Sequence, residues 1–191
     1  MKLVYIHGAS ATGDSFNYIR SQLKYKHDTV IEYNSDNGFE YNLDKMIPQL
    51  QFEKKLFFIC HSLGGIYALH LANIFKDSTL GAVTISTPYG GAESADYTKY
   101  FLPFNRLLRD IGPNSKPILS ANNIKIQHPW TNIVTTRGNS PWIIQKNDGV
   151  VTFNSMTHKQ DMEFIEIDSN HYEVVISPIT VEVINRCLTE L

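Results

Sequence analysis

The segment from Lys55 to Gly65 constrains the fold of this chain more than any other. Its first half, residues 56–60, is an unbroken run of apolar and aromatic residues, and its second half contains Ser62 among small residues. Beyond it, apolar side chains recur at helical spacing as far as Phe75, with no proline. A short apolar run that stops at small residues and continues as a helical pattern predicts a buried strand that turns sharply into a helix.

A serine at the tip of such a turn has chemical consequences. Its hydroxyl projects above the end of the sheet, and the first NH groups of the helix supply a partial positive field there. The tight turn needs small residues two before and two after the serine, which are Cys60 and Gly64. The segment resembles the nucleophile elbow of the α/β-hydrolase family, Gly-x-Ser-x-Gly, with Cys60 in place of the first glycine. The alternative is that Ser62 merely turns a strand-to-helix corner.

Strand and helix patterns alternate along the rest of the chain. Helical patterns follow the first, second and elbow strands, and a last helix is expected to open at Ser177-Pro178. Besides the elbow strand, the predicted strands are residues 3–6, 29–33, 80–86, 132–136 and 163–167. This alternation predicts the α/β class, with a mostly parallel sheet of about six strands and helices on both faces. The resemblance implies a pared-down α/β-hydrolase that lacks the first two strands of larger members.

Length and charge limit the other possibilities. A chain of 191 residues that is 42% hydrophobic can bury one sizeable core, so we expect a single domain over residues 1–191. The net charge of -2, without long basic or acidic runs, gives no argument for binding nucleic acid. The first apolar run is too short for a signal peptide, and none is long enough to span a membrane. The two distant cysteines suit buried thiols, so we expect a cytoplasmic protein.

The loop after the first strand has two interpretations. Residues 8–15 match the phosphate-binding pattern Gly-x4-Gly-Lys-Ser/Thr except that Asp14 replaces the lysine, which puts a negative charge where phosphate needs a cation. His7-Gly8-Ala9 instead resembles the strand-ending His-Gly of lipases and esterases. That resemblance implies an oxyanion hole made by the backbone NH groups of Ala9 and Leu63, the latter directly after the serine. An ordinary turn remains the alternative.

A serine hydroxyl needs a histidine to take its proton, and the family order along the chain is serine, acid, histidine. Three of the seven histidines precede Ser62. Three more lie on the helix after the elbow or before the last predicted strand. His171 follows that strand, residues 163–167, through a short loop, and this placement favours it as the base.

The acid is expected on a loop after the preceding strand. Asp148 lies there beside a turn glycine, with an apolar Val-Val pair behind it. The Asp-Gly-Val-Val stretch and the later Asn-His-Tyr resemble the acid and histidine segments of compact lipases, which implies that Asp148 orients His171. Asp168 is the rival, but it lies only three residues from His171.

An insertion at about residues 88–129 follows a strand's carboxyl end, a place typical of lids and substrate walls. Within it, four apolar residues recur at helical spacing: Phe101, Phe104, Leu108 and Ile111. This stripe either packs permanently on the body or covers Ser62 and meets the acyl chain of a substrate. We expect substrate contacts from Phe104, Ser10 and Thr87.

The resemblance implies a serine hydrolase that cleaves carboxylic esters through a triad of Ser62, His171 and Asp148 and an acyl-enzyme. Its expected substrate is a small ester or a lipid-like molecule, with no cofactor. The same chemistry serves thioesters and amides, so a thioesterase or an amidase is an alternative. A binding module that keeps the fold without catalysis is another. No cluster of His, Cys, Asp and Glu has metal-ligand spacing, so no metal is expected.

Overall fold

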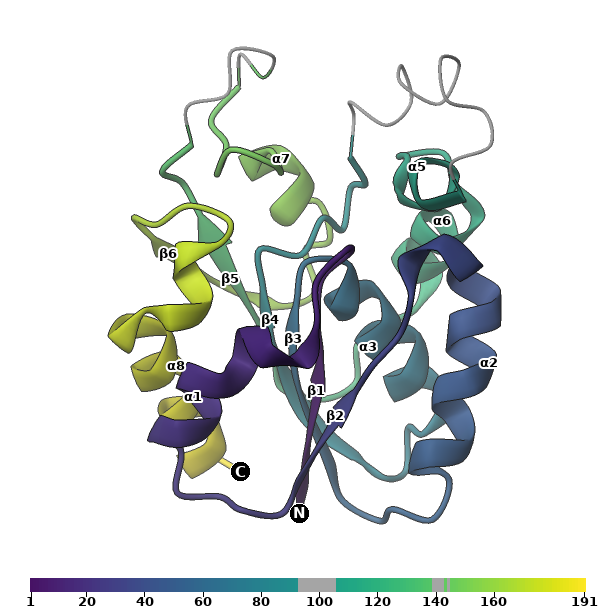
Figure 1. Ribbon diagram of the computed structural model, residues 1–191, viewed down its shortest axis with the longest axis vertical. Coiled ribbons are helices and arrows are strands. Elements are labelled where there is room, and N and C mark those ends of the chain that lie inside the picture. Colours follow the sequence, from purple (N-terminus) through teal and green to yellow (C-terminus); the bar gives the residue numbers. More distant parts are fainter. Residues whose placement is uncertain (93–105, 139–142, 144) are drawn as a thin grey trace.

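The computed structural model describes residues 1–92, 106–138, 143 and 145–191 (Figure 1). Its centre is a sheet of six strands in the order β2-β1-β3-β4-β5-β6, and every neighbouring pair is parallel. The strands are β1 (Lys2–Ile6), β2 (Asp28–Ile31), β3 (Leu56–His61), β4 (Thr79–Ile85), β5 (Trp130–Thr135) and β6 (Glu163–Ile167). The predicted parallel sheet of about six strands is therefore confirmed.

Helices cover both faces of the sheet (Figure 1). On one face lie α2 (Phe39–Leu50), α3 (Leu63–Ile74) and α6 (Lys116–Asn123), and on the other lie α1 (Asn17–Gln22) and α8 (Pro178–Thr189). The strand side chains alternate between two apolar clusters, so Val4 and Phe58 pack with the first group of helices while Leu3 and Phe57 pack with the second. Burial on both faces explains the continuous apolar run of β3.

The pairing register brings the carboxyl ends of the central strands to one level. Ile6 pairs with Cys60, His61 pairs with Ile85, and Ile85 pairs with Ile133. The residues that follow these strands therefore meet at a single edge of the sheet, where ligands bind in open α/β folds.

The insertion contains more regular structure than expected. Two short helices, α5 (Arg106–Ile111) and α6, lie in the insertion, for which the sequence pattern predicts one helical stripe. In α6, Ile118 and Ala121 are buried in the core cluster beside α3, so this part packs permanently on the body. Phe101 and Phe104 lie outside the described residues.

The remaining helical turns are short. They are η1 (Gly13–Phe16), η2 (Ser35–Asn37), α7 (Phe153–Met156) and η3 (Glu173–Ile176). The helices α2, α3 and α8 have 12 residues each, whereas a membrane span needs about 20 apolar residues. Across the residues that the structure describes, no helix combines the length and the apolar character needed to span a membrane. The last helix begins at Pro178 after Ser177, as predicted.

Candidate active site

Ser62 lies in a strained turn between β3 and α3. Its backbone has φ 53° and ψ -125°, a conformation that non-glycine residues seldom adopt. A Cβ atom on Gly64 would lie 2.1 Å from the carbonyl oxygen of Ile6, and one on Gly65 would lie 2.0 Å from Oγ1 of Thr87. Both glycines are therefore needed for helix α3 to lie this close to β1 and to Thr87.

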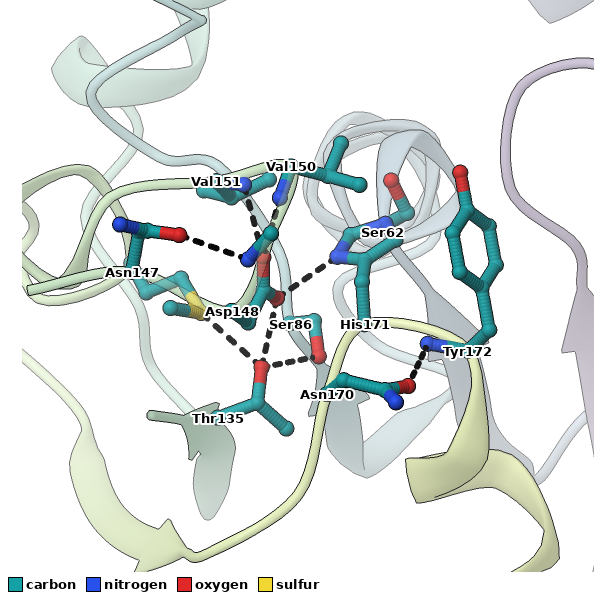
Figure 2. Close-up of polar contacts among 12 residues, drawn as sticks. Ser62, Ser86, Thr135, Asn147, Asp148, Val150, Val151, Asn170, His171 and Tyr172 are labelled. Atoms are coloured by element: carbon teal, nitrogen blue, oxygen red, sulfur yellow. Dashed lines mark hydrogen bonds and ion pairs between the residues drawn. The ribbon is translucent and has the colours of Figure 1, made fainter. Parts of the chain in front are cut away.

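His171 and Asp148 form a buried hydrogen-bonded pair. Nδ1 of His171 donates to Oδ2 of Asp148 over 2.7 Å, and the two residues are 3% and 1% exposed (Figure 2). The other carboxylate oxygen, Oδ1, accepts the backbone NH groups of Val150 and Val151 at 3.0 and 2.7 Å. The turn that Gly149 makes at φ 99° brings these NH groups back to the carboxylate of the preceding residue.

A fourth residue also donates a hydrogen bond to this carboxylate. The hydroxyl of Thr135, at the end of β5, donates to Oδ2 of Asp148 over 2.6 Å. Burial raises the pKa of Asp148, but the hydrogen bonds from His171 and Thr135 outweigh it, and the net pKa lies below the usual range. Asp148 is therefore ionised at neutral pH, as an acceptor for an imidazole NH must be.

His61 contacts the same histidine through its backbone and its ring. Its Nε2 lies 2.9 Å from the carbonyl oxygen of His171, and the two rings are 4.8 Å apart. Because a carbonyl only accepts, Nε2 of His61 carries the proton, which leaves Nδ1 buried without a partner among the described residues. Burial, with the neighbouring His171, lowers the pKa of His61 to about 3. His61 is thus neutral at any ordinary pH.

Ser62 and His171 line one cavity of about 470 Å³. Figure 2 labels both side chains and draws no hydrogen bond between them. None of the lining residues that the structure describes carries a carboxylate, ammonium or guanidinium group. The lining is formed by Gly8, Ala9, Ser10, Ala11, Ser15, His61, Ser62, Leu63, Pro88, Ala92, Leu107, Ile111, Val150, Val151, His171, Tyr172 and Val175.

The loop after β1 brings a backbone donor to this cavity. Both Ala9 and Leu63 line it, and within the described part of the chain neither backbone NH has a hydrogen-bond partner. For Leu63 this follows from its place as the first residue of α3. Nδ1 of His7, fully buried, lies 2.8 Å from the carbonyl oxygen of Gly8, and the His7 ring stacks on Tyr33, so its position is structural.

The residues expected to contact substrate, and the rival acid, differ in their positions relative to the cavity. Ser10 lines the cavity with φ 54°. Thr87, which we expected to contact substrate, is fully buried. Its hydroxyl donates to the carbonyl oxygen of Ser62 and so stabilises the turn between β3 and α3. That expectation is corrected, because packing against Gly65 turns Thr87 away from the cavity. Phe104 lies outside the described residues, and the rival acid Asp168 is exposed, while His171 bonds Asp148.

Two residues that sequence reasoning did not connect with Asp148 also lie at this edge. Thr135 bonds Asp148, and Ser86, directly after β4, bonds Thr135 (Figure 2). In the sequence, a serine or threonine at the end of a buried strand indicates that its hydroxyl has a hydrogen-bond partner at the sheet edge, because a buried hydroxyl requires one. Only the fold could reveal which partner. The described residues contain no group of three or more side chains that could hold a metal ion.

Comparison with solved structures gives matches across the whole chain. A metagenomic carboxyl esterase is 15% identical with a TM-score of 0.78, covering 100% of this chain and 76% of its own. A monoacylglycerol lipase from Paleococcus ferrophilus is 16% identical with a TM-score of 0.62, covering 99% and 92%. The chain has the α/β-hydrolase fold.

A further solved structure is matched over only part of its own length, and the sequence comparisons give no match. A phospholipase from Legionella pneumophila is 14% identical with a TM-score of 0.74, covering 98% of this chain. The present chain spans only 60% of that phospholipase. No family model and no curated protein matches the sequence. At these identities the α/β-hydrolase likeness is one of fold, and the chemistry has to be argued from the site.

Proposed function

We propose that this protein is a serine hydrolase of carboxylic esters, in which Ser62 is the nucleophile, His171 the base and Asp148 the acid. One observation carries the proposal: the buried 2.7 Å pair of His171 and Asp148 lies at the same cavity as a serine held in a strained elbow. A strained serine beside an oriented imidazole is the arrangement that activates a hydroxyl for acyl transfer.

The geometry supports a two-step reaction. Oγ of Ser62 attacks the ester carbonyl carbon while Nε2 of His171 takes its proton, and the carboxylate of Asp148 stabilises the imidazolium. The carbonyl oxygen becomes negative and accepts the unpaired NH groups of Ala9 and Leu63. The imidazolium then protonates the departing alkoxide, which leaves an acyl-enzyme. Water, deprotonated by His171, releases the acid and restores Ser62.

The cavity walls favour a neutral substrate with an apolar acyl group. Among the residues that the structure describes, the walls are mostly alanine, valine, leucine, isoleucine and proline side chains without a charged group, so these walls would offer no counter-charge to a charged acyl chain that loses its hydration. Each methylene that enters such a wall contributes about 0.8 kcal/mol. Three proteins of the same fold are described as a carboxyl esterase, a monoacylglycerol lipase and a phospholipase, which agrees with ester chemistry.

The decisive experiment is labelling with a fluorophosphonate probe together with hydrolysis of p-nitrophenyl butyrate. We expect wild-type protein to be labelled and active, and Ser62→Ala to lose the label and about three orders of magnitude in kcat/KM. Ser21→Ala, which changes an exposed serine on α1, is the matched control and should behave as wild type. An unlabelled, inactive wild-type protein would instead indicate a binding module, and labelling of Ser62→Ala would refute the assigned nucleophile.

A further inference from the structure

Two buried hydroxyl groups behind Asp148 form a chain of hydrogen bonds. Ser86 and Thr135 are both fully buried, and their oxygens lie 2.7 Å apart. Oγ1 of Thr135 lies 2.6 Å from Oδ2 of Asp148, the same oxygen that accepts Nδ1 of His171 (Figure 2). The chain therefore runs from the end of β4 through the end of β5 to the acid.

The direction of each hydrogen bond can be assigned. An ionised carboxylate only accepts, so Thr135 donates its single hydroxyl proton to Asp148. Thr135 then has only lone pairs left for Ser86, and Ser86 must donate to it. Sδ of Met156 lies 3.6 Å from the Thr135 oxygen, but a thioether is a much weaker acceptor than a carboxylate at 2.6 Å.

The backbone holds both hydroxyls in place. Thr135 is the last residue of β5, and the NH of Ser86 donates to the carbonyl oxygen of Ile133 over 2.8 Å. Ser86 has φ 52°, nearly the same angle as Ser62 one strand away, where His61 pairs with Ile85. A fully buried serine in this costly conformation requires surroundings that fix it.

We propose that Ser86 and Thr135 are positioning residues, which hold Oδ2 of Asp148 in line with Nδ1 of His171 so that the imidazole presents Nε2 to Ser62. This inference rests on the proposed function. Oδ1 is already fixed by two backbone NH groups, so the Thr135 hydroxyl fixes the remaining rotation of the carboxylate. Because Thr135 and Nδ1 of His171 bond the same oxygen, the negative charge of Oδ2 is shared between two partners.

Removing the Thr135 hydroxyl has a defined consequence for the pair. Oδ2 would keep one lone pair buried without a donor, and its negative charge would act more strongly on the imidazole. The imidazolium form of His171 would become more favourable. The acid limb of the pH–rate profile should therefore move to higher pH, a change that lost packing alone would not produce. His61, the neighbouring titratable ring, stays neutral in this range and does not contribute.

The test compares Thr135→Val, Thr135→Ser and Ser86→Ala with a matched control. Thr84→Val removes a fully buried hydroxyl from β4 that bonds Tyr89 and Asn132 instead of the site. We expect Thr135→Val to lower kcat roughly tenfold with little change in KM, because hydrogen bonds to charged groups are worth about that much. Thr135→Ser should restore most of kcat, Ser86→Ala should show a smaller change in the same direction, and Thr84→Val should leave kcat and the acid limb unchanged.

The downfield proton resonance of Nδ1 of His171 gives a readout that does not require turnover. It should shift in Thr135→Val and Ser86→Ala and stay in place in Thr84→Val. An unshifted resonance together with an unchanged acid limb would overturn the positioning role, and if Thr135→Val fails to fold, Ser86→Ala alone decides. A shifted resonance in a protein without esterase activity would support the positioning of His171 while refuting the proposed function.

Discussion

At the scale of single residues, Asp148 is the most completely bonded side chain of the site. Its two oxygens accept four hydrogen bonds, from the backbone of Val150 and Val151 and from the side chains of Thr135 and His171. Four donors hold the carboxylate group in one orientation, and they favour its ionised form. Asp168, three residues from His171, is exposed.

The first prediction at this scale separates the two aspartates. Asp148→Asn should lower kcat by about three orders of magnitude, because an amide that presents its NH₂ to Nδ1 would favour the wrong tautomer of His171. Asp168→Asn is the matched control and should retain wild-type rates. Steady-state hydrolysis of a short p-nitrophenyl ester checks both variants. A crippled Asp168→Asn beside an active Asp148→Asn would transfer the role of acid to Asp168.

Single residues also show how far sequence reasoning reaches. Asp148 and His171 were paired from chain order and a family resemblance, and the structure brings them within hydrogen-bond distance. Thr87 was expected to contact substrate, but its side chain packs against Gly65 of α3. This contact depends on how closely α3 packs on the sheet, which the sequence does not reveal. Thr135 was overlooked in the sequence because a threonine that ends a strand looks like any other.

At the scale of secondary-structure elements, α5 forms one wall of the cavity. Leu107 and Ile111 line it and are partly buried against the core, whereas the following helix, α6, is packed on α3. Both α5, which lines the cavity, and α6, which packs on α3, belong to the insertion. A lid need therefore not extend over all of residues 88–129. We propose α5 as the part of the insertion that meets the acyl chain.

A chain-length profile tests the role of α5. Leu107→Ala should lower hydrolysis of octanoate far more than of acetate, since each lost methylene contact costs about 0.8 kcal/mol, or about fourfold in rate. Leu119→Ala, on the exposed side of α6, is the matched control and should keep the wild-type profile. The measurement is the octanoate-to-acetate ratio of kcat/KM, alongside the melting temperature. A lower melting temperature with an unchanged ratio would mean that Leu107 is only a packing residue.

Elements were the easiest level to predict. The strand at 163–167 agrees with its prediction to the residue, and the other strands agree within two residues at their ends, because buried parallel strands are apolar runs bounded by polar turns. Helix α6 was missed, although Ser115 and Pro117 are typical of a helix start. Its short length and single apolar face, over Ile118 and Ala121, give a weak periodic signal.

At the scale of the whole molecule, stability should depend on pH through buried histidines. Burial lowers the pKa of His61 to about 3 and also lowers that of His70, so protons bind the unfolded chain more readily. The free energy of unfolding should therefore fall as pH drops below the unfolded histidine value of about 6.5, and His61 should keep contributing to this loss down to about pH 3.

The corresponding prediction isolates His61. His61→Gln keeps a donor toward the carbonyl oxygen of His171 but cannot titrate. Between pH 6.5 and 4.5, wild-type stability should fall more steeply than that of the variant, by at most about 1.4 kcal/mol per pH unit. Urea unfolding at several pH values measures both slopes. Parallel slopes would show that His61 takes up a proton in the folded protein as readily as in the unfolded chain.

The strand order has a consequence for how the protein is made. The chain lays down β1 next to one edge of the sheet, adds β2 as that edge strand, and then builds outward on the other side to β6. His171 comes after the last strand, and its contact with His61 spans 110 positions. Contacts this distant in sequence form late, because long loops must close first. A growing polypeptide would thus contain Ser62 well before His171 is in place. Under the proposed function, a half-synthesised chain would therefore carry no activated nucleophile.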